Sequence, residues 1–128
     1  MKREILFRGK DKVTKRWVYG DYTHNEGLNT HYISRNVNNI SRKVWEVDPD
    51  TVGQYTEFKD KNGKKIFEGD IIESKGYRHI VTYDENMAGF CSANVKYPED
   101  LCGINQQWIN ECGKVVIGNV TDNLELMK

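Results

Sequence analysis

A chain of 128 residues is the length of one domain and can bury about two thirds of its unfolded surface, so neither a disulfide nor a metal is needed for folding. Its 19 Lys and Arg residues balance 19 Asp and Glu residues, which argues against a protein that binds DNA through a general basic surface. No apolar run approaches the roughly 18 residues that span a bilayer, and the start of the chain lacks the apolar core of a signal peptide, so we expect a cytoplasmic protein without a membrane partner.

The N-terminal part alternates apolar and polar residues in short runs, which is typical of half-buried strands. We predict a hairpin over Arg3–Tyr22, in which the strands Glu4–Arg8 and Lys15–Tyr22 flank a polar loop over Gly9–Thr14. Gly20, inside the second strand, predicts a bulge or a close approach of two backbones. The next elements are a loop over Thr23–Thr30, a strand over His31–Ser34 and a turn or ragged loop over Asn36–Arg42.

The middle of the chain carries the clearest turn signals. We predict that the strand Lys43–Val47 ends at Pro49, because proline offers no donor to a strand ladder. Asp50 or Thr51 is then expected to cap a short turn before Gly53. The later turn signals are Asn62-Gly63, which predicts a two-residue hairpin turn with positive φ at both positions, and Glu68-Gly69-Asp70, with a left-handed glycine.

The C-terminal half continues the pattern of short strands. The predicted strands are Asp70–Glu73, Tyr77–Tyr83, Gly89–Ala93 and Lys114–Val120. The stretch Lys96–Gly113 is less regular, and it holds either a short helix around Pro98–Cys102 or a long irregular excursion. Thr121 or Asp122 is expected to cap a final helical turn through Met127.

These elements predict an all-β, β-dominated fold, built from small barrel-like or sandwich-like hairpins with a short C-terminal helical turn. We expect one domain over residues 1–128, with two lobes meeting near residues 47–72 as the alternative. The residues predicted to be mostly buried are Trp45, Val47, Tyr55, Ile66, Phe67, Ile71, Ile72, Ile80, Val116 and Ile117.

Three segments carry a family resemblance. Residues 47–72, VDPDTVGQYTEFKDKNGKKIFEGDII, resemble the signature of the YopX protein family, as do ILFRGKDKVTKRWVYG near the start and VIGNVTDNLELM at the end. The resemblance implies a mainly β fold encoded by a bacteriophage or prophage, in a family without a settled biochemical activity. Members commonly have glycine and leucine where this chain has Glu57 and Phe58, so we expect a backbone at Glu57 that does not require glycine.

Metal, cofactor and catalytic sites are not predicted. The cysteines (Cys91, Cys102 and Cys112) lie about ten residues apart, and the histidines (His24, His31 and His79) are scattered, without the close pairs of a zinc site or the even count of a disulfide framework. Cys91 and Ser92 beside His79 would form a nucleophile and base only if their strands were adjacent. The remaining alternative is a Mg²⁺-dependent enzyme that uses Glu68, Asp70, Glu73, Asp84 and Glu85, although Asp70 is more simply a turn residue that accepts backbone N–H groups.

A nucleic-acid-binding module is the second hypothesis for function. Basic and aromatic residues interleave on the first hairpin, and further lysines lie at the later turn: Lys10, Lys12, Lys15, Arg16 and Trp17, then Lys61 and Lys64. Small β-barrels bind single strands through aromatic platforms beside basic grooves. The structural alternative is that these lysines are solvated and that Trp17 belongs to the core.

Protein–protein contact is the first hypothesis. Seven tyrosines and three tryptophans are a large aromatic supply for a domain of this size, and strand edges pair readily with other chains. We therefore expect a non-enzymatic phage or prophage accessory protein in the bacterial cytoplasm. Its partner would be a host or phage protein, or a second copy of the chain.

Overall fold

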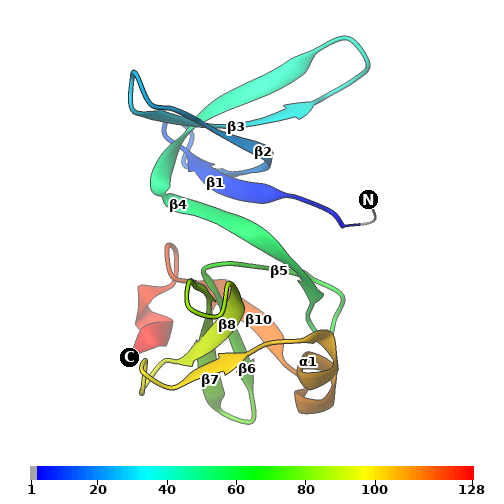
Figure 1. The fold of residues 1–128 in the computed structure, drawn as a ribbon, viewed down its shortest axis with the longest axis vertical. Helices are drawn as coiled ribbons and strands as arrows, with labels where there is room; N and C mark the ends of the chain where they lie inside the picture. Colours follow the sequence, from blue (N-terminus) through cyan, green and yellow to red (C-terminus); the bar gives the residue numbers. More distant parts are fainter. Residues whose placement is uncertain (1–2) are drawn as a thin grey trace. The chain divides into compact units, whose positions relative to one another are not determined.

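The computed structural model describes residues 3–128, and within them the chain divides into two compact units with a boundary between Tyr55 and Thr56 (Figure 1). Antiparallel strands make up most of the described residues, which confirms the all-β prediction. The strands are β1 (Phe7–Asp11), β2 (Trp17–Asn25), β3 (Thr30–Asn36), β4 (Arg42–Lys59), β5 (Lys65–Phe67), β6 (Asp70–Ser74), β7 (Tyr77–Asp84), β8 (Gly89–Asn94), β9 (Leu101–Gly103) and β10 (Val115–Asn119). The helices are α1 (Gln106–Cys112) and the 3₁₀ helix η1 (Leu124–Met127).

The first unit is a small closed barrel. Strands β1, β2, β3 and β4 pair in this order, and β1 also pairs with β4, so each strand has a neighbour on both sides. Ile33 and Val47 fill the interior and are fully buried. Gly20 lies where a Cβ atom would be 2.2 Å from the carbonyl oxygen of Ser34, which confirms the predicted close approach of two backbones.

The first hairpin is displaced along the sequence from its predicted position. Strand β1 begins at Phe7 and runs through Asp11, so half of the predicted loop is strand. Strand β2 continues to Asn25, and the predicted loop after it shrinks to a turn over residues 26–29. The hydrogen bonds between neighbouring strands therefore override the polar composition of these segments.

Strand β4 does not end at Pro49, contrary to the prediction. The β1–β4 register shifts between Arg8 and Lys10, and Pro49 lies in the resulting bulge. There the backbone N–H of Lys10 donates to the hydroxyl of Thr51 at 2.8 Å, and that hydroxyl donates to the carbonyl of Asp48 at 2.6 Å. The Thr51 hydroxyl thus replaces a ladder carbonyl as the acceptor for Lys10, and Pro49 lies in a bulge, where the regular ladder is already interrupted and proline is tolerated.

The second unit is a five-stranded antiparallel sheet in the order β10-β6-β7-β8-β9, together with the β4–β5 hairpin and α1. Its core consists of Ile66, Ile72, Val81, Ile104 and Ile109, against which Phe58, Phe90, Trp108 and Val116 pack. Of the ten residues predicted to be buried, six are buried, whereas Trp45, Ile80, Val116 and Ile117 are half-buried.

The β4–β5 turn has three residues rather than the predicted two. The N–H of Asp60 donates to the carbonyl of Lys64 at 2.8 Å, and the N–H of Gly63 donates to the carbonyl of Asp60 at 3.0 Å. Gly63 has φ +84°, whereas Asn62 keeps a negative φ, so this is a tight turn followed by a left-handed glycine. The turn after β5 matches its prediction, because Gly69 has φ +92° and the carboxylate of Asp70 accepts the N–H of Phe67 at 2.7 Å.

Helix α1 lies later in the chain than predicted. Residues 98–102 form a turn and the start of β9, whereas the helix begins after Asn105, whose side chain accepts the N–H of Trp108 at 2.8 Å. Gly113 ends the helix with φ +68°. The final helical turn is confirmed as η1, but Asn123 precedes it, and the N–H groups of Thr121 and Asp122 donate to Asn119 instead.

Glu57 has φ +75°, so the expectation that its backbone does not require glycine is wrong. The neighbouring Thr56 hydroxyl accepts the N–H of Phe58 at 3.2 Å and donates to the carbonyl of Ile66 at 2.8 Å. These bonds, together with the pairing of β4 and β5, hold Glu57 in a conformation that glycine adopts at lower cost.

Candidate functional site

Three exposed aliphatic side chains gather at the end of the β3–β4 hairpin, a group we call the hairpin tip. Ile40 is 96% exposed, Val44 59% and Val37 45%. Single exposed aliphatic residues are ordinary on protein surfaces, but three within eight residues of one hairpin form a local apolar projection.

The loop that carries Ile40 is ordered by one asparagine. The side-chain oxygen of Asn38 accepts the backbone N–H groups of Ile40 and Ser41, each at 2.8 Å, and the Ser41 hydroxyl at 3.2 Å. The N–H of Val37 donates to the carbonyl of Ser41 at 3.1 Å and closes the loop. The loop therefore holds Ile40 in solvent in a defined conformation.

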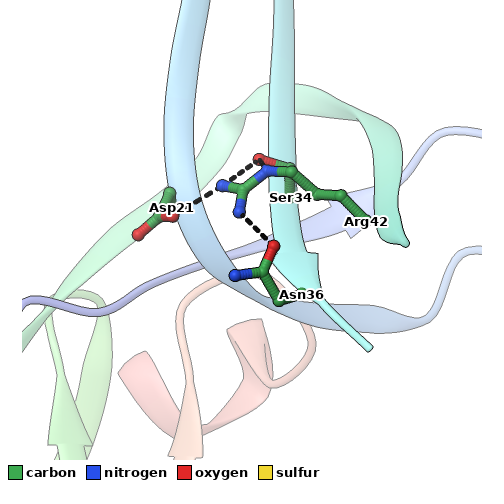
Figure 2. Close-up of polar contacts among 4 residues, drawn as sticks. All are labelled: Asp21, Ser34, Asn36 and Arg42. Atoms are coloured by element: carbon green, nitrogen blue, oxygen red, sulfur yellow. Dashed lines mark hydrogen bonds and ion pairs between the residues drawn. The ribbon is translucent and has the colours of Figure 1, made fainter. Parts of the chain in front are cut away.

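An arginine in the last strand pair before this loop connects several side chains, as Figure 2 shows, in an arrangement we call the polar clamp. The Arg42 guanidinium donates to the carboxylate of Asp21 at 2.6 Å, to the hydroxyl of Ser34 at 2.9 Å and to the side-chain oxygen of Asn36 at 3.0 Å. These four side chains come from β2, β3 and β4, so one guanidinium connects three strands. An exposed ion pair alone contributes little, but a network of this kind fixes the direction of the hairpin.

The basic and aromatic residues predicted for nucleic-acid binding lie on the β1–β2 hairpin, where several already have partners. Arg8 and Lys10 lie over the Trp17 ring, at 4.6 and 5.6 Å from its centroid. Lys12 pairs with Glu46 at 3.2 Å. Cations of the chain itself thus lie over the indole that was predicted to stack on bases, which leaves at most its other face to a base.

The other predicted basic residues are exposed but divided between the units. Lys15 and Arg16 follow the β1–β2 turn, and Lys61 and Lys64 lie on the β4–β5 turn of the second unit. Lys15 and Arg16 thus belong to the first unit, whereas Lys61 and Lys64 belong to the second.

The cysteine and histidine considered for nucleophilic catalysis lie on neighbouring strands but are not paired. His79 in β7 faces Asn94 across the ladder, whereas Cys91 in β8 faces Thr82. Burial, followed by the negative charges of Asp84 and Cys102, raises the pKa of the Cys91 thiol. Both observations disfavour an activated thiolate.

A buried lysine in the second unit escaped the sequence analysis. Lys114 is only 3% exposed, and its Nζ lies 3.4 Å from Nδ1 of His79 and 5.1 Å from the centroid of the Trp108 ring. Burial lowers the pKa of Lys114, and burial followed by the charge of Lys114 lowers the pKa of His79. Sequence gave no sign of this cluster, because its members come from β7, α1 and the residue before β10.

Within residues 3–128, no three His, Cys, Asp or Glu side chains are close enough together to hold a metal ion, and the three cysteines are free thiols. The acidic residues considered for Mg²⁺ therefore do not converge. No helix in this part of the chain is long and apolar enough to cross a membrane.

Comparisons with known proteins identify a matching sequence family and a similar solved structure. A sequence model of a family described as YopX protein matches residues 6–128. Among solved structures, the chain is similar to protein EF1440 from Enterococcus faecalis, with a TM-score of 0.60 and 24% sequence identity over 98% of this chain and 99% of that chain. At this identity the likeness shows a shared fold. No curated protein matches the chain.

Proposed function

Since the chain belongs to the YopX protein family, we propose a bacteriophage or prophage accessory protein that acts without catalysis, through protein contacts made by the hairpin tip. The observation that carries the proposal is the 96% exposure of Ile40 on an ordered loop. Interface anchors are side chains that enter a pocket of the partner, and they bind best when they are already held in the bound conformation.

The polar clamp supports the same proposal. Arg42 binds three side chains where the strands meet the loop, which reduces the conformational freedom that the tip would lose on binding. The charged side chains of the same segment have partners of their own, since Arg42 pairs with Asp21 and Lys43 lies by the Trp45 ring, so the tip offers an apolar contact surface. The partner is therefore expected to be a protein with an apolar pocket, either a host or phage protein or a second copy of this chain.

A pull-down from bacterial lysate tests the proposal, with Ile40→Ser as the variant and Val13→Ser as the matched control. Val13 is 88% exposed on the β1–β2 turn of the same unit, so both changes remove an exposed β-branched side chain. We expect a specific partner to copurify with the wild-type chain and the Val13→Ser variant, with or without nuclease, and to be lost with Ile40→Ser.

Equal recovery with all three proteins would refute the role of the tip. The mass of the purified chain in solution distinguishes self-association from binding to another protein. A dimer that dissociates on Ile40→Ser would identify a second copy as the occupant.

Nucleic-acid binding through the β1–β2 hairpin is the second candidate, favoured by the exposure of Lys15 and Arg16 beside the Trp17 cluster. Its test is retention on single-stranded DNA at low salt, where phosphate contacts are strongest. Loss of retention on reversing the charges of Lys15 and Arg16 would support this candidate, and partners that vanish on nuclease treatment would favour it over the first.

A further inference from the structure

A pocket of about 460 Å³ opens beside the buried lysine of the second unit. Residues from β6, β7, β9 and α1 line it, together with Lys75 in the β6–β7 turn and Lys114, which directly precedes β10. The lining residues used below are Lys75, Tyr77, His79, Trp108, Glu111 and Lys114. This volume falls within the range of about 300–1,000 Å³ that is typical of small-molecule sites.

The Lys114 ammonium has no carboxylate of the described residues in direct contact: burial lowers the pKa of Lys114, and the charge of Glu73, which raises it, does not outweigh this effect. Within residues 3–128, His79 is the one hydrogen-bond partner of its Nζ, and no carboxylate of this part of the chain forms an ion pair with it. An ammonium has three donors, so at least two of them remain available at the pocket. A buried cation without a carboxylate costs free energy, which an arriving anion would recover.

The walls of the pocket suit a flat apolar group. The Trp108 ring lies 5.1 Å from Nζ of Lys114 and makes an edge contact with the His79 ring at 6.0 Å. Tyr77, 66% exposed, adds a second aromatic side chain to the lining. Cation and aromatic wall are therefore adjacent, as a ligand with an acidic group on an aromatic ring would require.

The acidic residue of the lining does not oppose this arrangement. Glu111 is exposed to solvent, and its carboxylate accepts the side-chain amide of Gln107 at 2.9 Å. Its charge is thus hydrated and hydrogen-bonded, whereas Lys114 is almost fully buried.

We propose that this pocket binds a small aromatic carboxylate, whose carboxylate pairs with Lys114 and whose ring packs against Trp108. The charge of Lys114 selects the anion, and the apolar lining selects the flat body. This site lies in the second unit and does not depend on the hairpin tip, which belongs to the first.

The test compares 2-naphthoate with its neutral amide, 2-naphthamide, as ligands of the full chain, with NMR titration as the readout. We expect the carboxylate to bind at least about tenfold more tightly than the amide, as a hydrogen bond to a charged group would provide, and to shift the indole N–H signal of Trp108. The variant Lys114→Met should remove this preference. The control Lys75→Met, which removes an exposed lysine from the same lining, should retain it.

Equal affinity for carboxylate and amide, or the absence of binding by either probe, would overturn the proposal. So would a preference for the carboxylate that survives Lys114→Met. If that variant fails to fold, the comparison of the two probes on the wild-type chain still decides, because the probes share their apolar body and differ in charge.

Discussion

Replacing Asp60 by alanine should destabilise the second unit by about 3 kcal/mol. Asp60 is only 5% exposed, and its two carboxylate oxygens accept the backbone N–H groups of Asn62, Lys64 and Val116 at 2.8, 2.9 and 3.0 Å. Each bond to a charged acceptor contributes about 1.5–3 kcal/mol. Asn62 and Lys64 are exposed, so water would replace part of their bonds, whereas the half-buried Val116 would lose its partner. We therefore expect a loss in the free energy of unfolding that corresponds to about two such bonds, each at about 1.5 kcal/mol, rather than to three.

Hydrogen exchange measures this effect at the three amides, and urea unfolding measures the whole unit. We expect Asp60→Ala to reduce protection at the Asn62, Lys64 and Val116 amides and to lower the unfolding midpoint. The control is Asp100→Ala, an exposed aspartate of the same unit whose side chain makes no hydrogen bond within residues 3–128, and it should change stability by less than about 0.5 kcal/mol. Unchanged protection of Val116 in Asp60→Ala would refute the reasoning.

Three further predictions concern other parts of the chain. Glu57→Gly should raise the free energy of unfolding by about 0.5–1 kcal/mol in urea titration, because relief of the positive φ exceeds the added entropy of the unfolded chain; a lower midpoint would contradict it. Arg42→Met should reduce partner recovery in the pull-down although Ile40 is intact, and undiminished recovery would show that the clamp is dispensable. For Lys114, the pKa is lowered by burial, so the unfolded chain binds more protons between that lowered pKa and the ordinary value of 10.5, and stability should rise with pH in this window. Parallel urea titrations should show no such rise in Lys114→Met, and an equal rise in both proteins would exclude Lys114 as its source.

Sequence predicted the elements whose conformation is decided locally. Gly69 and Asp70 form the expected turn because a left-handed glycine and a carboxylate that accepts a nearby N–H need no distant partner. The close approach of two backbones at Gly20 could be predicted because a glycine inside a strand commonly marks either such an approach or a bulge.

Elements that depend on a distant partner were misplaced. Pro49 continues β4 because it lies in a bulge, where the Thr51 hydroxyl accepts the N–H of Lys10 in β1, and these two residues are about forty positions apart in sequence. The two-residue turn at Asn62-Gly63 became a three-residue turn because Asp60 accepts the neighbouring N–H groups. Asn105 was the one local signal that could have located α1, since an asparagine followed by a helix and Gly113 is a capping pattern.

The two candidate sites were missed for different reasons. Ile40 was read as part of a ragged turn, since its exposure depends on the loop that Asn38 orders. The Lys114 pocket combines residues from β7, α1 and the start of β10, and no spacing along the chain brings His79, Trp108 and Lys114 together. The antiparallel pairing of β6 with β7 and with β10 brings His79 and Lys114 together, and α1 adds Trp108.

Ile40 and Lys114 depart in opposite directions from the rule that folding buries apolar groups and leaves charges in water. Ile40 is 96% exposed and Lys114 is 3% exposed, so an apolar group stays in water at one position and an ammonium is removed from water at the other. Ile40→Ser places a polar side chain in water and Lys114→Met places an apolar side chain in the interior. Both variants should therefore keep or raise the free energy of unfolding. If binding is lost in these variants while the free energy of unfolding is kept, the unusual exposure serves a partner or ligand, whereas a loss of stability would assign the side chain to the fold itself.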